Sequence, residues 1–202
     1  RQRGFRNVVL WPRGVDINLF HPRAGDLGLP RPIFLSVGRI AVEKNLDAFL
    51  GLDLPGTKVV VGDGPARGDL ERAYPDAVFL GARTGEQLAE IYAAADVFVF
   101  PSGTDTFGLV LLEALASGVP VAAFPVTGPR DVLGDAPVGF LSEDLRSACL
   151  VALKIAPDAC LEFAASLTWE KSAAAFVRNI VETRAAAARS ANLQPASPHF
   201  VA

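Results

Sequence analysis

The chain has 202 residues, of which 50% are hydrophobic and 20% are charged, and its formal net charge at pH 7 is −3. This composition predicts a compact globular protein, excludes a disordered chain, and argues against a nucleic-acid partner, which needs a clustered basic face. Two cysteines, Cys149 and Cys160, and two histidines are too few for a disulfide framework or a zinc site. We therefore expect reduced, packed cysteines, no metal and no cofactor.

The sequence contains no pattern typical of a leader peptide or a membrane span. The first ten residues lack the apolar core of a signal peptide. The apolar run over residues 107–126 contains Glu113 and is broken at Gly118-Val119-Pro120, which indicates a helix stopped by glycine and followed by a strand. The cytoplasm is the compartment that we expect.

Residues 1–30 differ in character from the residues that follow. They contain one short strand-like piece, residues 7–10, and two closely spaced turns with proline at Trp11-Pro12 and His21-Pro22. Two such turns indicate a connector that crosses a surface rather than a strand inside a sheet.

From residue 31 to residue 155, short β-branched apolar runs alternate with helical patterns. They predict strands at 33–37, 58–61, 78–80, 96–100 and 119–124, and helices at 45–52, 67–74, 84–94 and 107–117. Alternating strands and helices need right-handed crossovers and give a parallel sheet covered on both faces. The sequence therefore predicts an α/β domain, a Rossmann-like doubly wound parallel sheet, over residues 31–155.

Two cations follow the first predicted strand. Gly38-Arg39 ends this strand, and Lys44 comes five residues after Arg39. Ligands bind beyond the carboxyl ends of the strands in open parallel sheets, so the two cations are placed to neutralise a diphosphate. The alternative is a pair of solvated loop charges, and the spacing alone does not separate the two.

Glycines follow the second predicted strand, in the sequence Gly62-Asp63-Gly64-Pro65. Gly62 and Gly64 let the backbone approach a ligand closely, although a tight turn between strand and helix explains them as well. The segment is not the glycine fingerprint of dinucleotide-binding proteins, because residue 67 is arginine. A nicotinamide-dependent dehydrogenase is therefore disfavoured.

Two acids accompany the predicted helix 107–117. Asp105 precedes the helix and Glu113 lies inside it, on an otherwise apolar segment. A carboxylate there is costly unless a polar group reaches it, so we expect a partner for Glu113. The free amides of Phe107, Gly108 and Leu109 would form an anion site at the helix start. Asp105 is also a candidate N-cap, the commonest role of Asp at such a position.

These two acids do not suit a glycosidase. Glycoside hydrolysis needs two carboxyl groups that face each other across the scissile bond. Here one acid precedes a helix and the other lies about 12 Å along it, at about 1.5 Å of rise per residue.

Beyond Gly139 the pattern is helical. It predicts one helix over residues 143–154, further C-terminal helices over 156–190 with Thr168 as a cap, and a disordered tail over 191–202. Apolar residues recur at helical spacing after Thr168, a pattern typical of core packing: Trp169, Ala173, Phe176, Val177 and Ile180.

Taken together and in order, these motifs resemble the C-terminal, donor-binding half of GT-B retaining glycosyltransferases, from the large group 1 family of sugar-nucleotide-dependent mannosyl- and glucosyltransferases. The resemblance covers roughly residues 11–180. The matching motifs are Trp11-Pro12-Arg13-Gly14-Val15-Asp16, Val37-Gly38-Arg39 with Glu43-Lys44-Asn45, Gly62-Asp63-Gly64-Pro65, Ala95-Asp96-Val97, and the element from Asp105 to Glu113.

The resemblance implies a role for each site residue. Arg39 and Lys44 would hold the diphosphate of a GDP- or UDP-linked sugar, Asp105 would bind hydroxyls of the transferred sugar, and Glu113 would bind the ribose. Amides of Phe107, Gly108 and Leu109 would touch sugar and phosphates, and Arg83, in the loop Leu80-Gly81-Ala82-Arg83, would lie near the base. The similar enzymes retain anomeric configuration and usually need no metal.

The chain departs from this family in two ways. The first acid of the family is usually Glu, whereas this chain has Asp105, whose carboxylate lies about 1.5 Å closer to the backbone. The resemblance also implies an N-terminal acceptor domain joined through residues 1–30, and we expect it to be missing here. The chain alone would then bind donor but transfer it poorly or not at all, contact an acceptor or a membrane only through that half, and self-associate through exposed apolar surface.

Two alternatives remain beside a glycosyltransferase half. One is half of a GT-B-type sugar-nucleotide epimerase, which would consume the sugar nucleotide without an acceptor. The other is a non-catalytic nucleotide-sugar-binding module with a vestigial pocket. Arg39, Lys44 and Glu113 together argue against decay, because an empty pocket would leave buried charge unpaired.

Overall fold

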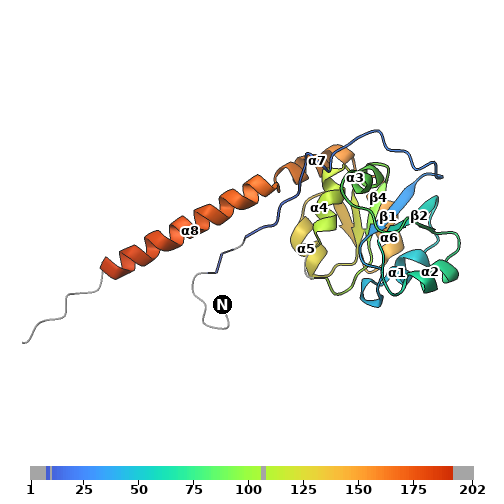
Figure 1. Ribbon diagram of the computed structural model, residues 1–202, viewed down its shortest axis with the longest axis horizontal. Helices are drawn as coiled ribbons and strands as arrows, with labels where there is room; N and C mark the ends of the chain where they lie inside the picture. Colours follow the sequence, from blue (N-terminus) through green and yellow to red (C-terminus); the bar gives the residue numbers. More distant parts are fainter. Residues whose placement is uncertain (1–7, 10, 106–107, 193–202) are drawn as a thin grey trace, which may run out of the picture.

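The computed structural model describes residues 8–9, 11–105 and 108–192. Six parallel strands form one sheet in the order β3-β2-β1-β4-β5-β6. The strands are β1 (Ile33–Val37), β2 (Thr57–Val61), β3 (Val78–Phe79), β4 (Val97–Phe100), β5 (Val121–Ala123) and β6 (Gly139–Leu141). The predicted Rossmann-like doubly wound sheet is confirmed (Figure 1).

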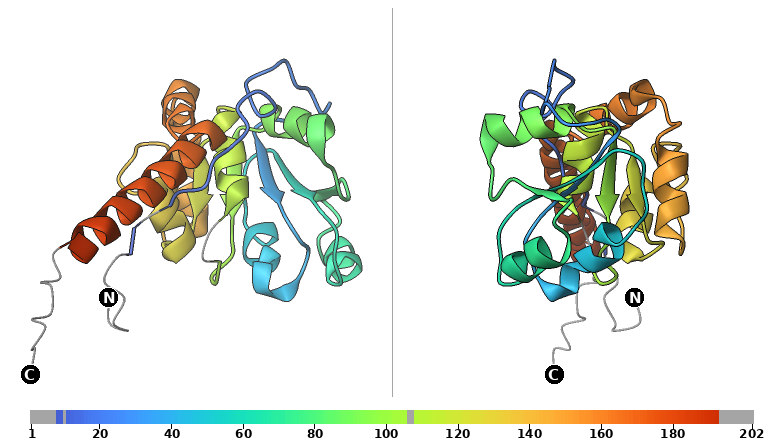
Figure 2. Two further views of the ribbon diagram at one scale, coloured as in Figure 1. Left: turned by 60° about the vertical axis from the view of Figure 1, so that its left-hand side comes forward. Right: turned by 90° about the vertical axis from the view of Figure 1, so that its right-hand side faces the viewer.

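Helices cover both faces of the sheet. They are η1 (Val42–Lys44), α1 (Leu46–Leu50), α2 (Arg67–Ala73), α3 (Gly85–Ala93), α4 (Leu109–Ala116), α5 (Thr127–Leu133), α6 (Leu145–Ala152), α7 (Pro157–Ala165) and α8 (Trp169–Asn192). One buried cluster packs α1, α2 and α6 on one face, and the other packs α3, α4, α5 and α7 on the opposite face (Figure 2). Alternate residues of the central strands feed the two clusters, as in β4, where Val97 and Val99 face one side and Phe98 and Phe100 the other.

The chain reverses its strand order between β1 and β4. β2 and β3 are added outward on one side of β1, and β4 then pairs with the other side of β1. The helices that follow β1 and β4 consequently leave to opposite faces, and a crevice opens at the carboxyl ends of these two strands. All four residues of β4 are buried, so this strand fixes one wall of that crevice rigidly.

The sequence prediction lacks the short helix η1 and, later in the chain, helix α5 and strand β6. The region after Gly139 begins with strand β6 rather than with helix, and α5 precedes it. β6 has only three residues and Phe140 is exposed, as in an edge strand that carries no clear apolar run. Gly128-Pro129 lies in the first turn of α5, where proline costs little because the first amides of a helix lack intrahelical acceptors.

The N-terminal segment runs beside the start of α8. Val15 donates its amide to the carbonyl of Leu167 at 2.9 Å, and Ser172 donates its hydroxyl to the carbonyl of Pro12 at 2.7 Å. The rings of Trp11 and Phe176 pack with their centroids 4.8 Å apart. The predicted cap of this helix is confirmed, since the Thr168 hydroxyl accepts the amide of Lys171.

Most of α8 extends away from the sheet (Figure 1). The predicted packing of its apolar stripe in the core is wrong, because Phe176 and Ile180 are 44% and 43% exposed and Val177 and Trp169 are exposed as well. The stripe therefore leaves apolar surface uncovered. None of the helices that the structure describes has the length and hydropathy that crossing a bilayer requires.

The two cysteines are packing residues, as expected from the sequence. Cys149 on α6 and Cys160 on α7 lie buried in the clusters on opposite faces of the sheet. Burial raises the pKa of each thiol to about 12, which keeps both in the unreactive protonated form.

Candidate functional site

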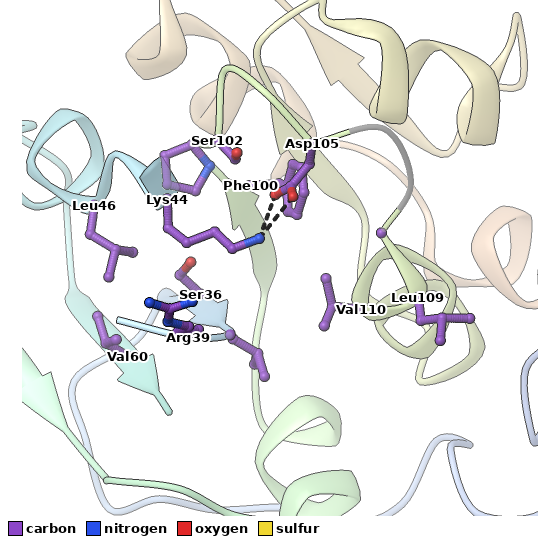
Figure 3. A pocket seen from close by; sticks show the side chains of 14 residues that line it. Ser36, Arg39, Lys44, Leu46, Val60, Phe100, Ser102, Asp105, Leu109 and Val110 are labelled. Carbon is purple, nitrogen blue, oxygen red and sulfur yellow. Dashed lines mark hydrogen bonds and ion pairs between the residues drawn. The ribbon is translucent and has the colours of Figure 1, made fainter. Parts of the chain in front are cut away.

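A cavity of about 160 Å³ lies at the crevice between the carboxyl ends of β1 and β4. Six of the residues predicted from the sequence line it: Gly38, Arg39, Lys44, Asp105, Gly108 and Leu109. The first three come from the connection after β1, and the others come from the connection after β4 and the start of α4 (Figure 3). The topology therefore brings together residues about sixty positions apart in the chain, as expected at a switch point.

Lys44 and Asp105 form an ion pair across this cavity. The Lys44 Nζ donates to both carboxylate oxygens of Asp105 at 2.8 Å (Figure 3). The side chains are only 29% and 23% exposed, so the pair is better shielded from water than a surface ion pair. Asp105 does not cap α4, because Gly108 holds the N-cap position and no side chain bonds there; the N-cap alternative is wrong.

Arg39 stands at the mouth of the cavity. Its side chain is 65% exposed, and its guanidinium lies 3.7 Å from Glu43 in a loose contact. An exposed ion pair of this kind contributes little to stability. The guanidinium consequently remains available to an anion that enters the cavity beside Lys44.

The start of α4 faces the same cavity. Gly108 and Leu109 line it, and α4 begins at Leu109 with Gly108 in extended conformation before it. Backbone amides at a helix start lack intrahelical acceptors and favour anions. The predicted amide of Phe107 lies outside the described residues.

Glu113 lies on α4, one helical turn after Leu109. Its carboxylate accepts a 3.0 Å hydrogen bond from the hydroxyl of Tyr92 on α3, which supplies the polar partner expected from the sequence. Burial raises the pKa of Glu113, and the hydrogen bond from Tyr92 opposes that rise. The pKa of Tyr92 is raised well above its usual range by burial and by the negative charge of Glu113, so the hydroxyl stays a donor.

Glu113 does not line the cavity between β1 and β4. It borders a separate cavity of about 70 Å³, which is also lined by Gly14, Val15 and Asp16 of the N-terminal segment and by Trp169. Leu109 lines both cavities and stands between them. The candidate site residues thus lie at two cavities, a larger compartment with Lys44 and Asp105 and a smaller compartment with Glu113.

Gly62, Gly64 and Arg83 are not among the residues that line either cavity. A Cβ on Gly62 would overlap the carbonyl oxygen of Gly38, and one on Gly64 would overlap that of Ile40. These glycines therefore let the turn after β2 pack against the loop after β1, which favours the tight-turn interpretation. Arg83 is exposed and donates to the carbonyl of its neighbour Ala82.

Three residues of the site were not predicted. Asn45 and Ser102 hydrogen-bond between the loops after β1 and β4, and Tyr92 holds Glu113. Only Asn45 carries a local signal, since Asn before a helix is often a cap or a left-handed residue. Among the described residues, no group of three or more His, Cys, Asp or Glu side chains is placed to hold a metal ion.

A family model described as "Glycosyl transferases group 1" matches residues 31–155. A GDP-mannose-dependent alpha-mannosyltransferase of Mycobacterium tuberculosis is 45% identical over 148 residues, which are 69% of this chain and 39% of that protein. The chain therefore spans well under half of this curated relative.

Solved structures share the fold. Sucrose-phosphate synthase from Thermosynechococcus elongatus superposes with a TM-score of 0.75 and 27% identity, over 88% of this chain and 53% of that chain. The C-terminal domain of a group 1 glycosyl transferase from Francisella tularensis superposes with a TM-score of 0.62 and 21% identity, over 76% of this chain and 97% of that chain. The sheet and its helices therefore match the Rossmann-like half of GT-B glycosyltransferases.

Proposed function

Because this chain belongs to the glycosyl transferases group 1 family, we propose that it is the donor-binding part of a mannosyltransferase that uses GDP-mannose. The observation that carries the proposal is the cavity between β1 and β4, where Arg39, Lys44 and Asp105 meet the start of α4. The 45% identical relative, named for GDP-mannose, favours this donor over a UDP-linked sugar.

Lys44 and Arg39 would bind the diphosphate of the donor. The Lys44 ammonium has three N–H donors and spends two on Asp105, so it can add a phosphate oxygen without leaving its carboxylate. Arg39 offers a planar fork at the cavity mouth, the geometry that suits phosphate oxygens. Two positive charges there stabilise the diphosphate as it leaves.

Asp105 would bind hydroxyl groups of the mannose. Its carboxylate, held by Lys44, would accept hydrogen bonds from sugar hydroxyls, and Gly108 and Leu109 at the start of α4 line the same cavity. A carboxylate held in place by a cation loses little conformational freedom when the sugar binds. This supports a role in orienting the transferred sugar.

Glu113 would bind the ribose in the smaller compartment. Tyr92 uses one carboxylate oxygen, Oε2, which leaves acceptor capacity for ribose hydroxyls. The cavity of about 70 Å³ beside Glu113 is smaller than a ribose, so the N-terminal segment over it would shift when donor binds.

The proposed reaction retains configuration and needs no metal. The oxygen of the acceptor hydroxyl forms a bond to the anomeric carbon on the face from which the diphosphate leaves, the bond from that carbon to the phosphate oxygen breaks, and the hydroxyl proton passes to the departing diphosphate. The acceptor would lie in an N-terminal half, which closes the cleft and excludes water. The part of this chain that matches the relative covers 39% of that protein, and this chain would bind the donor and transfer it poorly by itself.

Thermal unfolding with added nucleotides tests the proposal. GDP-mannose and GDP at a hundred times their dissociation constants should stabilise the chain by about 2.7 kcal/mol. UDP, ADP and NAD at those same concentrations should stabilise it less. Lys44→Ala should abolish the shift, and the matched control Lys154→Ala, an exposed lysine remote from the cavity, should keep it. A GDP shift as large in Lys44→Ala as in wild type, or stabilisation by NAD alone, would refute the proposed site.

A further inference from the structure

The loops that follow β1 and β4 are tied together by a set of side-chain bonds. Asn45 Nδ2 donates to the carbonyl of Pro101 at 3.1 Å, and the hydroxyl of Ser102 donates to the carbonyl of Glu43 at 3.3 Å. These bonds flank the Lys44–Asp105 ion pair on both loops. Loops are in general more mobile than the helices and strands that they connect. Hydrogen bonds between these two loops, which lie about sixty residues apart in the chain, therefore indicate that the loops are held at a fixed separation.

Asn45 has an unusual backbone conformation. Its φ of 53° and ψ of 38° are left-handed, and no other non-glycine residue described by the structure has a positive φ. Its amide donates to the carbonyl of Val42, and its carbonyl accepts from Ala48, so it joins η1 to α1 within a single residue. The sharp change of direction there leaves Lys44, the last residue of η1, pointing into the cavity (Figure 3).

The side chain of Asn45 donates to the carbonyl of Pro101, at the start of the loop that carries Asp105. Pro101 comes directly after β4 and, like Ser102, it is buried. Both line the cavity, and Asp105 follows three residues after Ser102. A bond to the carbonyl of Pro101 therefore fixes the point at which the loop that carries Asp105 leaves the sheet.

We infer that Asn45 is a positioning residue, which clamps the two loops so that Lys44 and Asp105 meet across the cavity. Its side-chain amide contributes the donor, and its left-handed backbone aims Lys44. The inference rests on the proposed function for the use of that pair in donor binding, but the clamp itself is a property of the chain without donor. Arg39 lies on the same loop and is exposed, so the clamp acts on Lys44 and not on Arg39.

Two substitutions separate the clamp from folding. Asn45→Gly keeps a left-handed backbone, which glycine adopts without strain, and removes the side-chain amide. Asn45→Asp keeps the size and tolerates the left-handed conformation, but places an acceptor against the carbonyl of Pro101. Asn18→Gly, in an exposed turn, is the matched control for the added chain entropy of glycine.

The reactivity of the Lys44 amine gives a readout that needs no donor. Brief treatment with an amine-acetylating reagent, followed by mass spectrometry, measures acetylation of Lys44 relative to exposed Lys154 in each folded variant. We expect Lys44 in both Asn45 variants to react about three- to tenfold faster than in wild type, because the amine spends less time bonded to Asp105. Asn18→Gly should leave the ratio unchanged.

Calorimetric titration with GDP-mannose completes the test. We expect the Kd of the Asn45 variants to rise about tenfold. An unchanged Lys44 reactivity in folded Asn45→Gly and Asn45→Asp would overturn the clamp, whatever the donor does. Faster Lys44 acetylation in a chain whose wild type binds no GDP-mannose would support the clamp and refute the proposed function.

Discussion

The hydroxyl of Tyr92 donates a 3.0 Å hydrogen bond to Oε2 of Glu113, and this bond joins α3 to α4 beneath the candidate site. Tyr92 is completely buried, and its ring packs edge-on against Phe20 of the N-terminal segment. The same side chain thus contacts Glu113 and the N-terminal segment that lines the cavity beside it. Tyr92 therefore links Glu113 to the N-terminal segment through one side chain.

Replacing Tyr92 by phenylalanine should destabilise the chain. The ring keeps its packing, but Glu113 loses its hydrogen-bond donor within a largely apolar environment, at a cost of about 1.5–3 kcal/mol for a bond to a charged group. Urea denaturation measures the change in the free energy of unfolding. Tyr74→Phe is the control, because Tyr74 donates to Asp47 at 3.2 Å on the surface and its loss should cost far less. Equal costs for the two substitutions would contradict this account.

The raised pKa of Glu113 predicts a dependence of stability on pH. The folded state binds the Glu113 proton more tightly than the unfolded state, whose carboxyl has an ordinary pKa near 4.5. Protonation therefore favours folding, and the contribution of Glu113 to the free energy of unfolding falls as pH rises from the unfolded pKa through the higher folded pKa. Above the folded pKa the penalty for burying the charge is complete.

Glu113→Gln isolates this contribution. The difference between the free energies of unfolding of wild type and Glu113→Gln, measured in urea from about pH 4 to about pH 7, should move against wild type as pH rises. Other titrating groups affect both proteins alike and cancel in the difference. A difference that is flat, or that moves in favour of wild type, would mean that burial does not raise the pKa of Glu113.

The sequence predicted the sheet because its signals are local. Val97-Phe98-Val99-Phe100 identifies a doubly buried strand by itself, and the alternation of such runs with helices fixes a parallel topology. β6 and α5 were not predicted. Gly139-Phe140-Leu141 is too short to show an alternating pattern, and Gly128-Pro129, in the first turn of α5, is more typical of a loop than of a helix.

The site was predictable only in part, for a related reason. Topology alone brings the loops after β1 and β4 to one crevice, so Arg39, Lys44 and Asp105 could be grouped from the sequence. The ion pair between Lys44 and Asp105 joins two loops whose conformations the sequence does not show, and the separate cavity beside Glu113 depends on how the N-terminal segment lies. Both features bring together residues far apart in the chain, Lys44 with Asp105 and Glu113 with the N-terminal segment, so no spacing rule reveals them.

Arg39→Ala should weaken binding without weakening the fold. Its only ion-pair contact among the described residues is with Glu43 at 3.7 Å, and its side chain is mostly exposed, so the free energy of unfolding should change by less than about 0.5 kcal/mol. Loss of one charged hydrogen bond to the diphosphate should raise the Kd for GDP about tenfold or more, as measured by calorimetric titration. Arg72→Ala, an exposed arginine on α2 paired with Asp69, should leave that Kd unchanged. Unaltered GDP affinity in Arg39→Ala would remove Arg39 from the donor site.

Gly62→Ala should disrupt the site by way of the fold. Gly62 has a φ of 142°, which alanine adopts with strain, and an added Cβ would overlap the carbonyl oxygen of Gly38 in the loop that leads to Lys44. We expect a loss of about 2–4 kcal/mol in the free energy of unfolding, since the overlapping atom belongs to the backbone and cannot rotate away. Gly68→Ala is the matched control: Gly68 lies in α2 with only the end of the Arg72 side chain near an added Cβ, so alanine should stabilise the helix by about 0.5–1 kcal/mol. Urea denaturation of both variants decides the matter, and a Gly62→Ala protein as stable as wild type would show that the turn after β2 does not support the loop after β1.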